Sequence, residues 1–263
     1  SSNFNISFNK NKVLEVGVDG RPIYGSAANA NNAFITKPGY PIASFYGYKY
    51  IGVFQSEEEL AKYPHLSGDK VGDGRYEDVN KDGVLDQNDK TILGDNNPLF
   101  TAGFSNSFSY KNFTLDIQFT GSYGAEVFSF YKRMCGIYHG DRNGMIEQLG
   151  RWQSKDQPGD GIHFRPTRTP SGWQRDPSSA WVQDASYLRL RNLTLGYNFD
   201  QKVLDKMKMK GLRLYVTGQN LFTITNYVGY DPETSSESGL AQGGDYLGYP
   251  AARSFIIGAN ITF

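Results

Sequence analysis

An acidic segment of twelve residues is the part of the sequence whose residue types and spacing most clearly suggest chemistry. Residues 78–89 read DVNKDGVLDQND. Counted as a calcium-binding loop, this segment offers oxygens at positions 1, 3, 5, 7, 9 and 12 and a glycine at the turn position 6. The ligands would be Asp78, Asn80, Asp82, the Val84 carbonyl, Asp86 and Asp89. Clustered carboxylates repel one another unless a cation neutralises them, so we expect a structural Ca²⁺ here.

A surface turn rich in Asx residues is the alternative interpretation of the same segment. Its twelfth residue is Asp89, whose side chain is shorter than the glutamate usual at that position. The glycines and aspartates on both sides, at residues 72–74 and 94–95, argue against a complete helix-loop-helix unit. Asx side chains also stabilise turns without any metal. Both interpretations place the segment in a loop.

Aromatic and cationic side chains in residues 124–185 form a second, weaker candidate site. Such groups stack on sugar rings or bind acidic groups, so they are candidates for substrate binding. The residues are Trp152, Trp173, Trp181 and Arg168. Packing of this loop against the rim of the strands or against a lid is the alternative, and we favour it.

The remaining residues point to no catalytic chemistry. The three histidines, at positions 65, 139 and 163, have no metal-ligand spacing, and no nucleophile motif accompanies them. We expect no enzyme activity. The formal net charge is zero, with 27 basic and 27 acidic residues, which argues against a nucleic-acid partner.

Alternating residues between positions 100 and 123 give the clearest structural pattern. Apolar residues take every second position from Phe100 to Tyr110 except at Asn106, polar or small residues lie between them, and the alternation resumes after a two-residue break. A period of two predicts strands, and the short break predicts a hairpin. Similar alternation brings the prediction to six long strands in an all-β fold, the others being at residues 4–8, 193–199, 212–216 and 255–263.

One of these strands carries an irregularity that the sequence already indicates. Leu188 and Leu190 are at even-numbered positions, whereas Leu193 and Leu195 are at odd-numbered positions, so regular alternation would place the two pairs on opposite faces. A single strand can keep all four on one face only if an extra residue is inserted. We therefore expect either a β-bulge near Asn192 or a part of the strand that extends above the membrane.

The connections between the predicted strands alternate in length. Short breaks at residues 111–112 and 200–210 alternate with long segments at residues 14–99, 124–185 and 223–249. Outer-membrane barrels have short periplasmic turns and long extracellular loops, whereas a soluble sandwich has no such rule. We expect part of a large transmembrane antiparallel β-barrel that crosses the bacterial outer membrane several times. Because each backbone group left unpaired at a strand edge costs several kcal/mol in lipid, other strands of the same barrel must pair with these six.

Several segments of the sequence together resemble the C-terminal part of the SusC-like family of TonB-dependent outer-membrane transporters of Bacteroidetes. They occur in the family's order and span nearly the whole chain. The segments are PIASFYGYKYIGVF at 41–54, GDGRYEDVNKDG at 72–83, DASYLRLRNLTLGY at 184–197, LYVTGQNLF at 214–222 and GYDP at 229–232.

The resemblance implies a role and a set of partners. It implies that residues 1–263 are the C-terminal portion of a plugged barrel and that the plug domain is absent from this chain. Residues 14–99 would form an extracellular loop that carries the segment resembling a calcium-binding loop. The expected function is TonB-dependent import of an oligosaccharide or a peptide, with a SusD-like surface lipoprotein as partner and TonB contacted through the missing N-terminal part. Membrane lipid and the rest of the barrel are the other expected contacts.

Two other classes of function remain possible from the sequence. One is an outer-membrane structural or adhesion barrel whose calcium-ordered surface loop binds a partner protein. The other is a soluble β-domain stabilised by calcium. A plug and a TonB box in the full gene would argue against the first, and a monomer that needs no detergent would support the second.

Overall fold

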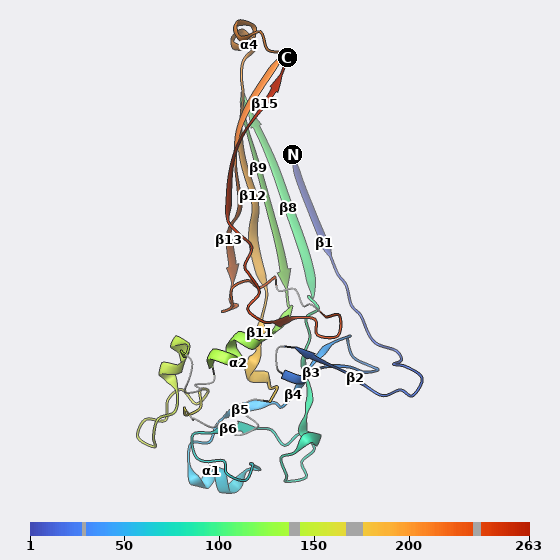
Figure 1. Cartoon of the computed structure of the whole chain (residues 1–263), viewed down its shortest axis with the longest axis vertical. Helices are drawn as coiled ribbons and strands as arrows, with labels where there is room; N and C mark the ends of the chain where they lie inside the picture. The colour runs from blue at the N-terminus through green and yellow to red at the C-terminus, as the bar shows by residue number, and fades with distance from the viewer. Residues whose placement is uncertain (28–29, 137–142, 167–175, 234–237) are drawn as a thin grey trace.

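The main sheet of the protein confirms the six predicted strands. The computed structural model describes residues 1–27, 30–136, 143–166, 176–233 and 238–263. All neighbouring strands of this sheet are antiparallel, and each strand pairs with the next one in chain order (Figure 1). The strands are β1 (Ser2–Ser7), β8 (Phe100–Tyr110), β9 (Phe113–Tyr123), β12 (Tyr187–Asn198), β13 (Gly211–Thr225) and β15 (Ser254–Thr262).

The sheet has one apolar face and one polar face. Phe4, Phe104 and Phe119 lie opposite one another on β1, β8 and β9, and the serines and threonines between them point to the other side. Side chains of the apolar face are exposed along the strands, with Phe108 at 54 % and Ile257 at 83 %. In water so large an apolar surface would be a liability, but in a membrane it contacts lipid.

Aromatic residues mark both ends of this apolar face. At one end Phe100 stacks on Tyr123 with ring centroids 5.5 Å apart, and at the other Tyr110 pairs with Phe113, which packs on Tyr197 at 4.9 Å. The ten residue steps of β8 cover about 34 Å along the strand, or about 26 Å along the barrel axis at a tilt of about 40°. That height matches the lipid-facing band of about 25 Å in outer-membrane barrels.

The predicted bulge is present in β12. Leu193 pairs with Ile117 and Leu190 pairs with Phe119, so β12 advances by three residues while β9 advances by two. The register between β12 and β13 shifts at the same place, where Asn220 adopts a left-handed conformation with a φ of 51°. Leu190 and Leu193 consequently share the apolar face despite their opposite parity.

The connections lie at opposite ends of the sheet according to their length (Figure 1). The turn at Lys111 and the connection that contains helix α4 (Gln201–Met207) are at one end. At the other end are three long loops, which we number in chain order as residues 8–99, 124–186 and 226–253. The third loop begins later than predicted because β13 continues as far as Thr225.

The long loops carry short strands and helices of their own. In the first loop, β2 (Ile23–Ala27), β3 (Ala30–Thr36), β4 (Ser44–Gly47) and β7 (Thr91–Gly94) form one sheet, β5 (Tyr50–Val53) pairs with β6 (Gly74–Tyr76), and α1 spans Glu57–Lys62. The second loop contains β10 (Glu126–Ser129), α2 (Phe130–Gly136) and β11 (Val182–Asp184), and β14 (Gly244–Asp245) of the third loop pairs with β10. A strand pairing therefore joins the second and third loops.

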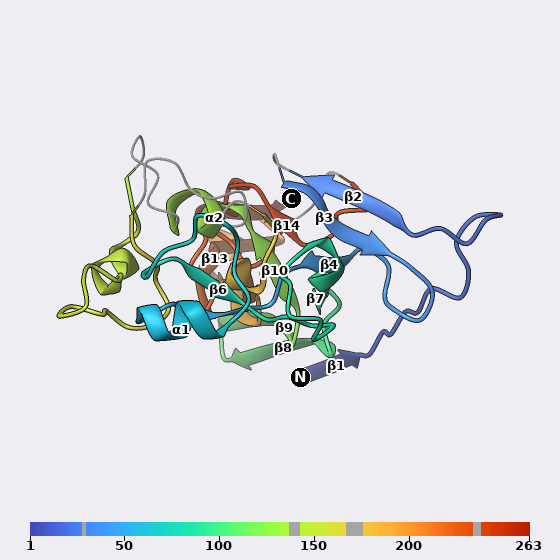
Figure 2. The ribbon, with the colours of Figure 1, turned by 90° about the horizontal axis from the view of Figure 1, so that it is seen from below.

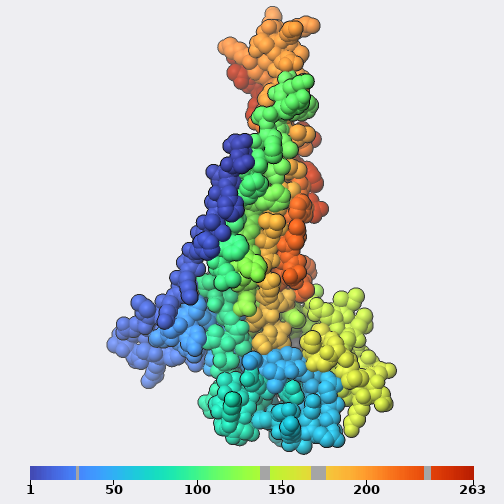
Figure 3. All heavy atoms as spheres, turned by 180° about the vertical axis from the view of Figure 1, so that it is seen from behind, coloured from blue at the N-terminus to red at the C-terminus, as the bar shows by residue number. Residues whose placement is uncertain are grey.

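A common hydrophobic core holds the three long loops together. Phe34 from the first loop packs on Phe128 from the second at 5.8 Å between ring centroids, and Trp181 packs on Phe128 at 5.9 Å. Ala241 of the third loop is buried in the same cluster. The loops thus form one packed body at the end of the sheet, which Figure 2 shows from the loop side and Figure 3 shows as a broad base beneath the narrower strands.

Backbone contacts between the first and second loops are equally close. The Tyr48 N–H donates to the Pro177 carbonyl at 2.9 Å, and the Ser179 N–H donates to the Tyr48 carbonyl at 3.0 Å. A Cβ on Gly47 would lie 2.1 Å from the Pro177 carbonyl oxygen, so only glycine permits this approach.

Among the residues that the structure describes, no helix is long and apolar enough to span a membrane.

Candidate functional site

The polar face of the sheet is a continuous surface of hydrogen-bonding side chains. The hydroxyls of Thr194 and Thr217 lie 2.8 Å apart across β12 and β13. Arg213 donates to Thr114 at 3.2 Å and lies 3.7 Å from the carboxylate of Asp116. Such cross-strand pairs fix the side chains of neighbouring strands relative to one another. In a barrel this face lines the interior, because the apolar face contacts lipid.

Arg189 connects this polar face to the third long loop. Its side chain is only 3 % exposed and forms ion pairs with Asp231 and with Glu233, the latter at 2.7 Å. Its Nε donates to Thr223 Oγ1 on the neighbouring strand β13 at 2.9 Å. The planar guanidinium, with its five N–H donors, suits such simultaneous pairing with several acceptors. One strand residue therefore holds two acidic residues of the loop.

Two further residues of β12 extend this ion-pair cluster. Arg191 pairs with the other carboxylate oxygen of Glu233 and donates from Nε to Thr120 Oγ1 at 3.2 Å. The Tyr187 hydroxyl donates to Glu233 at 2.6 Å. Glu233 is thus shared by two arginines and a tyrosine, all from one strand.

Asp231 is held in its ionised form despite being largely buried. Burial alone would raise the pKa of this carboxyl, but hydrogen bonds from the Ala251 N–H, the Arg189 guanidinium and the Glu233 N–H, together with the charge of Arg189, lower the pKa below its ordinary value. The bond from Ala251, at 3.0 Å, ties the far end of the third loop to the same carboxylate. The cluster therefore fixes both ends of this loop to the inner side of the sheet.

Arg189 and Asp231 both lie in segments that carry the family resemblance, but nothing in the sequence connects them. Arg189 belongs to the segment 184–197 and Asp231 to the GYDP segment at 229–232. One usable signal was present: Arg189 and Arg191 lie in a strand beside predicted apolar positions, and an arginine in a membrane strand needs an acidic partner. The sequence offered no indication of which acidic residue that was.

The predicted calcium loop has a turn geometry set by its own side chains. Asp78 accepts from the N–H groups of Lys81 at 2.6 Å and Gly83 at 2.9 Å, and Gly83 has a φ of 84°. Asp89 is fully buried and accepts from the N–H groups of Val79 and Asp86, each at 2.8 Å. These bonds bring the termini of the loop together.

The donor set of this loop suits a hard cation in its chemistry. It comprises carboxylates, one amide and one backbone carbonyl, the oxygen ligands that Ca²⁺ prefers. In the part of the chain that the structure describes, no three His, Cys, Asp or Glu side chains converge on a metal-binding position. The carboxylates of Asp78 and Asp89 instead accept backbone N–H groups, as in an Asx-rich turn. Calcium binding stays a prediction.

Two of the three tryptophans predicted as substrate candidates pack inside the long loops. Trp181 is 3 % exposed within the shared core, with Arg133 over its ring. Trp152 is partly buried against the same core and lies against Gly72, where a Cβ would come within 2.4 Å of the ring. Both rings therefore pack on other residues of the long loops. Trp173 and Arg168 lie outside the described residues.

Taken together, the two faces, the height of the apolar band and the alternating connections define the class of protein. The chain is a section of a transmembrane β-barrel of the bacterial outer membrane, and its sheet is open because only part of the barrel is present.

Comparisons with known proteins show which receptors the chain resembles. No family model matches the chain. The whole chain aligns with TonB-dependent receptor P3 of Formosa agariphila at 34 % identity and covers 26 % of that protein. It also matches TonB-dependent receptor SusC of Bacteroides thetaiotaomicron at 26 % identity, over 99 % of the chain and 24 % of SusC. The chain is similar over its whole length to TonB-dependent receptors, SusC among them, and it spans about a quarter of the length of these relatives.

Solved structures confirm the fold. The structure of the RagAB peptide transporter superposes with a TM-score of 0.77 at 20 % identity, over all of this chain and 26 % of that one. The RagAB peptide importer in its open-open state gives a TM-score of 0.73 at 21 % identity, again over all of this chain and 26 % of that one. These structures confirm the expected all-β barrel section, and together with the TonB-dependent receptors that the sequence matches they confirm the expected outer-membrane location.

Proposed function

We propose that the protein to which this chain belongs imports a nutrient oligomer, an oligosaccharide or a peptide, across the outer membrane with energy supplied through TonB. The observation that carries this proposal is the match of the entire chain to receptors named as TonB-dependent. RagAB, whose barrel has the same fold, is a peptide transporter. The relatives are named as receptors and not as enzymes, so we infer transport rather than catalysis for this protein as well.

The polar face supports a transport role physically. An inward surface of threonines, serines and paired charges hydrates readily and offers hydrogen bonds to a polar solute. Its charges are already paired, as in Arg213 with Asp116, so no isolated charge would trap a passing ligand. The wall section described here therefore suits passage of neutral polar oligomers as well as peptides.

The packed long loops suit a surface that meets a second protein. We place them outside the cell, following the rule for barrels with short periplasmic turns. Their shared core, with Phe34, Phe128 and Trp181, gives them one defined shape, and a preorganised surface binds a partner at lower entropic cost. We propose a SusD-like lipoprotein as that partner, and TonB as a partner of parts of the receptor outside this chain.

A calcium ion is the proposed cofactor. It would be held by the oxygens of residues 78–89 and would order the first long loop rather than take part in transport. Gly83, with its positive φ at the sixth position, supports this assignment, because a loop of this kind turns sharply there. The buried Asp89 at position 12 supplies the carboxylate that closes the loop.

Uptake by whole cells tests the proposed function. Cells with and without the intact gene are offered defined oligosaccharides and peptides as sole nutrients, and uptake is followed with labelled material. Loss of uptake of one ligand on gene deletion, restored by the intact gene but not by a copy lacking its TonB-contacting segment, is the expected result. Unchanged uptake for every ligand that the locus supports would refute the proposal and favour a structural or adhesion barrel.

A further inference from the structure

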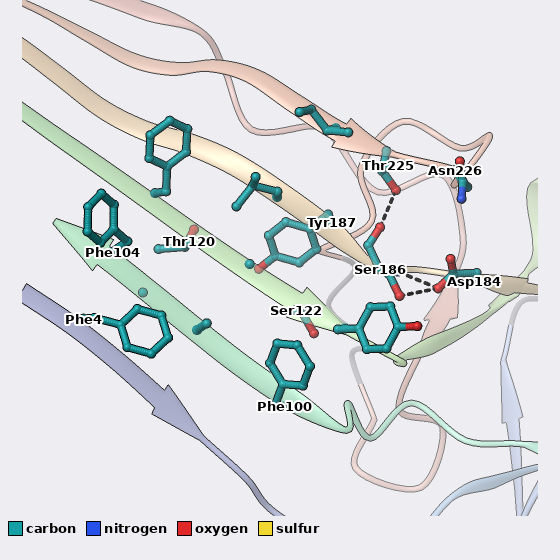
Figure 4. A pocket seen from close by; sticks show the side chains of 17 residues that line it. Phe4, Phe100, Phe104, Thr120, Ser122, Asp184, Ser186, Tyr187, Thr225 and Asn226 are labelled. Carbon is teal, nitrogen blue, oxygen red and sulfur yellow. Dashed lines mark hydrogen bonds between the residues drawn. The ribbon is translucent and has the colours of Figure 1, made fainter.

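A groove in the apolar face lies close to its long-loop end. It has a volume of about 450 Å³, and most of its lining comes from residues of β8, β9 and β12 (Figure 4). Volumes of this size are typical of small-molecule sites. If every cross-strand pair on this face carried side chains of similar size, the face would have no hollow. The floor is formed where Ala102 pairs with Gly121, and aromatic residues stand on both sides of it.

Small residues keep the floor of this groove low. Ala102 and Gly121 form one cross-strand rung, between the rung of Phe104 with Phe119 and the rung of Phe100 with Tyr123. The hollow at Gly121 is built into the backbone, because a Cβ there would lie 2.9 Å from the carbonyl oxygen of Tyr187. Two aromatic rungs thus border a rung with almost no side chain.

The position of the groove decides what can occupy it. It lies over β8, β9 and β12, in the middle of the sheet, so the strands that complete the barrel pair at β1 and β15 and do not cover it. Its walls face the membrane, within one rung of the aromatic residues at the long-loop end. A flexible hydrocarbon chain is the molecule that this environment supplies.

The rim of the groove speaks against recognition of a phosphate head group. Its polar lining residues include Asp184, Ser186 and Asn226, and no lysine or arginine is among the groove's lining residues. Ser186 is itself held by Asp184 and by Thr225, as Figure 4 shows. The selective part of the site is therefore its apolar floor and walls.

We propose that this groove is a binding site for one acyl chain of a membrane lipid in the leaflet next to the long loops. The chain lies across Ala102 and Gly121 with its sides against Phe104, Phe119 and Phe100. A lipid held in this way exchanges more slowly than the lipid around the rest of the barrel. The site goes beyond the proposed transport function and does not depend on it.

Cross-linking from a lipid tail tests the proposal on the full-length receptor. The receptor is reconstituted in nanodiscs with a phosphatidylethanolamine that carries a diazirine in one acyl chain, and labelled peptides are mapped by mass spectrometry after illumination. We expect labelling of residues 100–123 and 186–190 at least threefold above that of residues 254–262, although the apolar side chains of that strand are at least as exposed.

The matched variants are Ala102→Leu, which fills the groove, and Ala259→Leu, which adds the same side chain to the lipid face of β15 outside it. Ala102→Leu should reduce labelling at the groove to the level of β15, and Ala259→Leu should leave it unchanged. Even labelling over the apolar face, or equal labelling in both variants, would show bulk lipid only and overturn the proposal. Cross-links from the groove to a second protein chain would overturn it in favour of a protein contact. Retained heat-modifiable migration on gels confirms that each variant is folded.

Discussion

Replacing Asp231 by alanine should release the third long loop from the inner side of the sheet. The change leaves the buried guanidinium of Arg189 with Glu233 as its remaining acidic partner, and it removes the acceptor of the Ala251 N–H. Deleting one partner of a buried ion pair costs about 3–5 kcal/mol. Because Asp231 is 13 % exposed and Glu233 remains, we take about 3 kcal/mol, at the lower limit of that range.

That free energy predicts a measurable local opening. Since about 1.4 kcal/mol corresponds to a factor of ten, opening of the loop should become about 100-fold more frequent. Hydrogen exchange of the full-length receptor, followed by mass spectrometry, measures it in peptides covering residues 226–233 and 247–253. The β12–β13 ladder should keep its protection, because its backbone bonds are untouched.

The matched control is Asp19→Ala. Asp19 pairs with Arg21 at 3.4 Å, but the two side chains are 69 % and 85 % exposed, so the loss should be at most about 1 kcal/mol. If Asp231→Ala accelerated exchange no more than Asp19→Ala does, the ion-pair cluster would not hold the loop. If exchange rose equally throughout β12 and β13, the effect would be global unfolding and the local argument would be refuted.

Three further predictions follow from the same structure. Because the pKa of Asp231 is lowered, the stabilisation that its ionised form gives the third loop is complete above the ordinary pKa of 3.8 and is lost as the pH falls through the lower pKa of the folded state. Pepsin should therefore begin to cut the third loop only below about pH 4. Cutting that begins well above this pH would show that Asp231 does not hold the loop. Asp82→Asn should weaken calcium binding by the receptor at least tenfold in isothermal titration calorimetry, and Asp19→Asn should leave it unchanged. If the unsubstituted receptor bound no calcium, residues 78–89 would be an Asx-rich turn instead. Trp181→Ala should destabilise the packed loops by about 3–5 kcal/mol and expose all three to trypsin, and protection of the first loop in this variant would show that the core is not shared.

The strands could be predicted from the sequence because the membrane imposes one simple rule on them. Each strand contacts lipid on one side, so residues such as Phe104 and Leu115 recur with a period of two over most of the strand. The bulge was predictable for the same reason, since Leu190 and Leu193 can both face lipid only if a residue is inserted. A strict periodicity makes any departure from it visible.

The loop structure could not be predicted, because its contacts join residues far apart in the sequence. The approach of Gly47 to Pro177 and the packing of Phe34 on Phe128 leave no periodic pattern. The partner of Arg189 was hidden in the same way, since Asp231 lies 42 residues further along the chain. In the acidic segment 78–89, by contrast, the residues that form the turn lie close together in the sequence, so their spacing could be recognised directly.

The shared core of the three long loops has a consequence for how such receptors diversify. Each loop contributes aromatic or small residues to one cluster, with Phe34, Phe128 and Ala241 as examples from the three. Transplanting a single loop between relatives would therefore leave its former neighbours with exposed rings and a cavity. New surface specificities should arise either by exchange of all three loops together or by substitutions at loop tips outside the cluster. When these receptors are engineered, the three long loops should therefore be exchanged together as one unit.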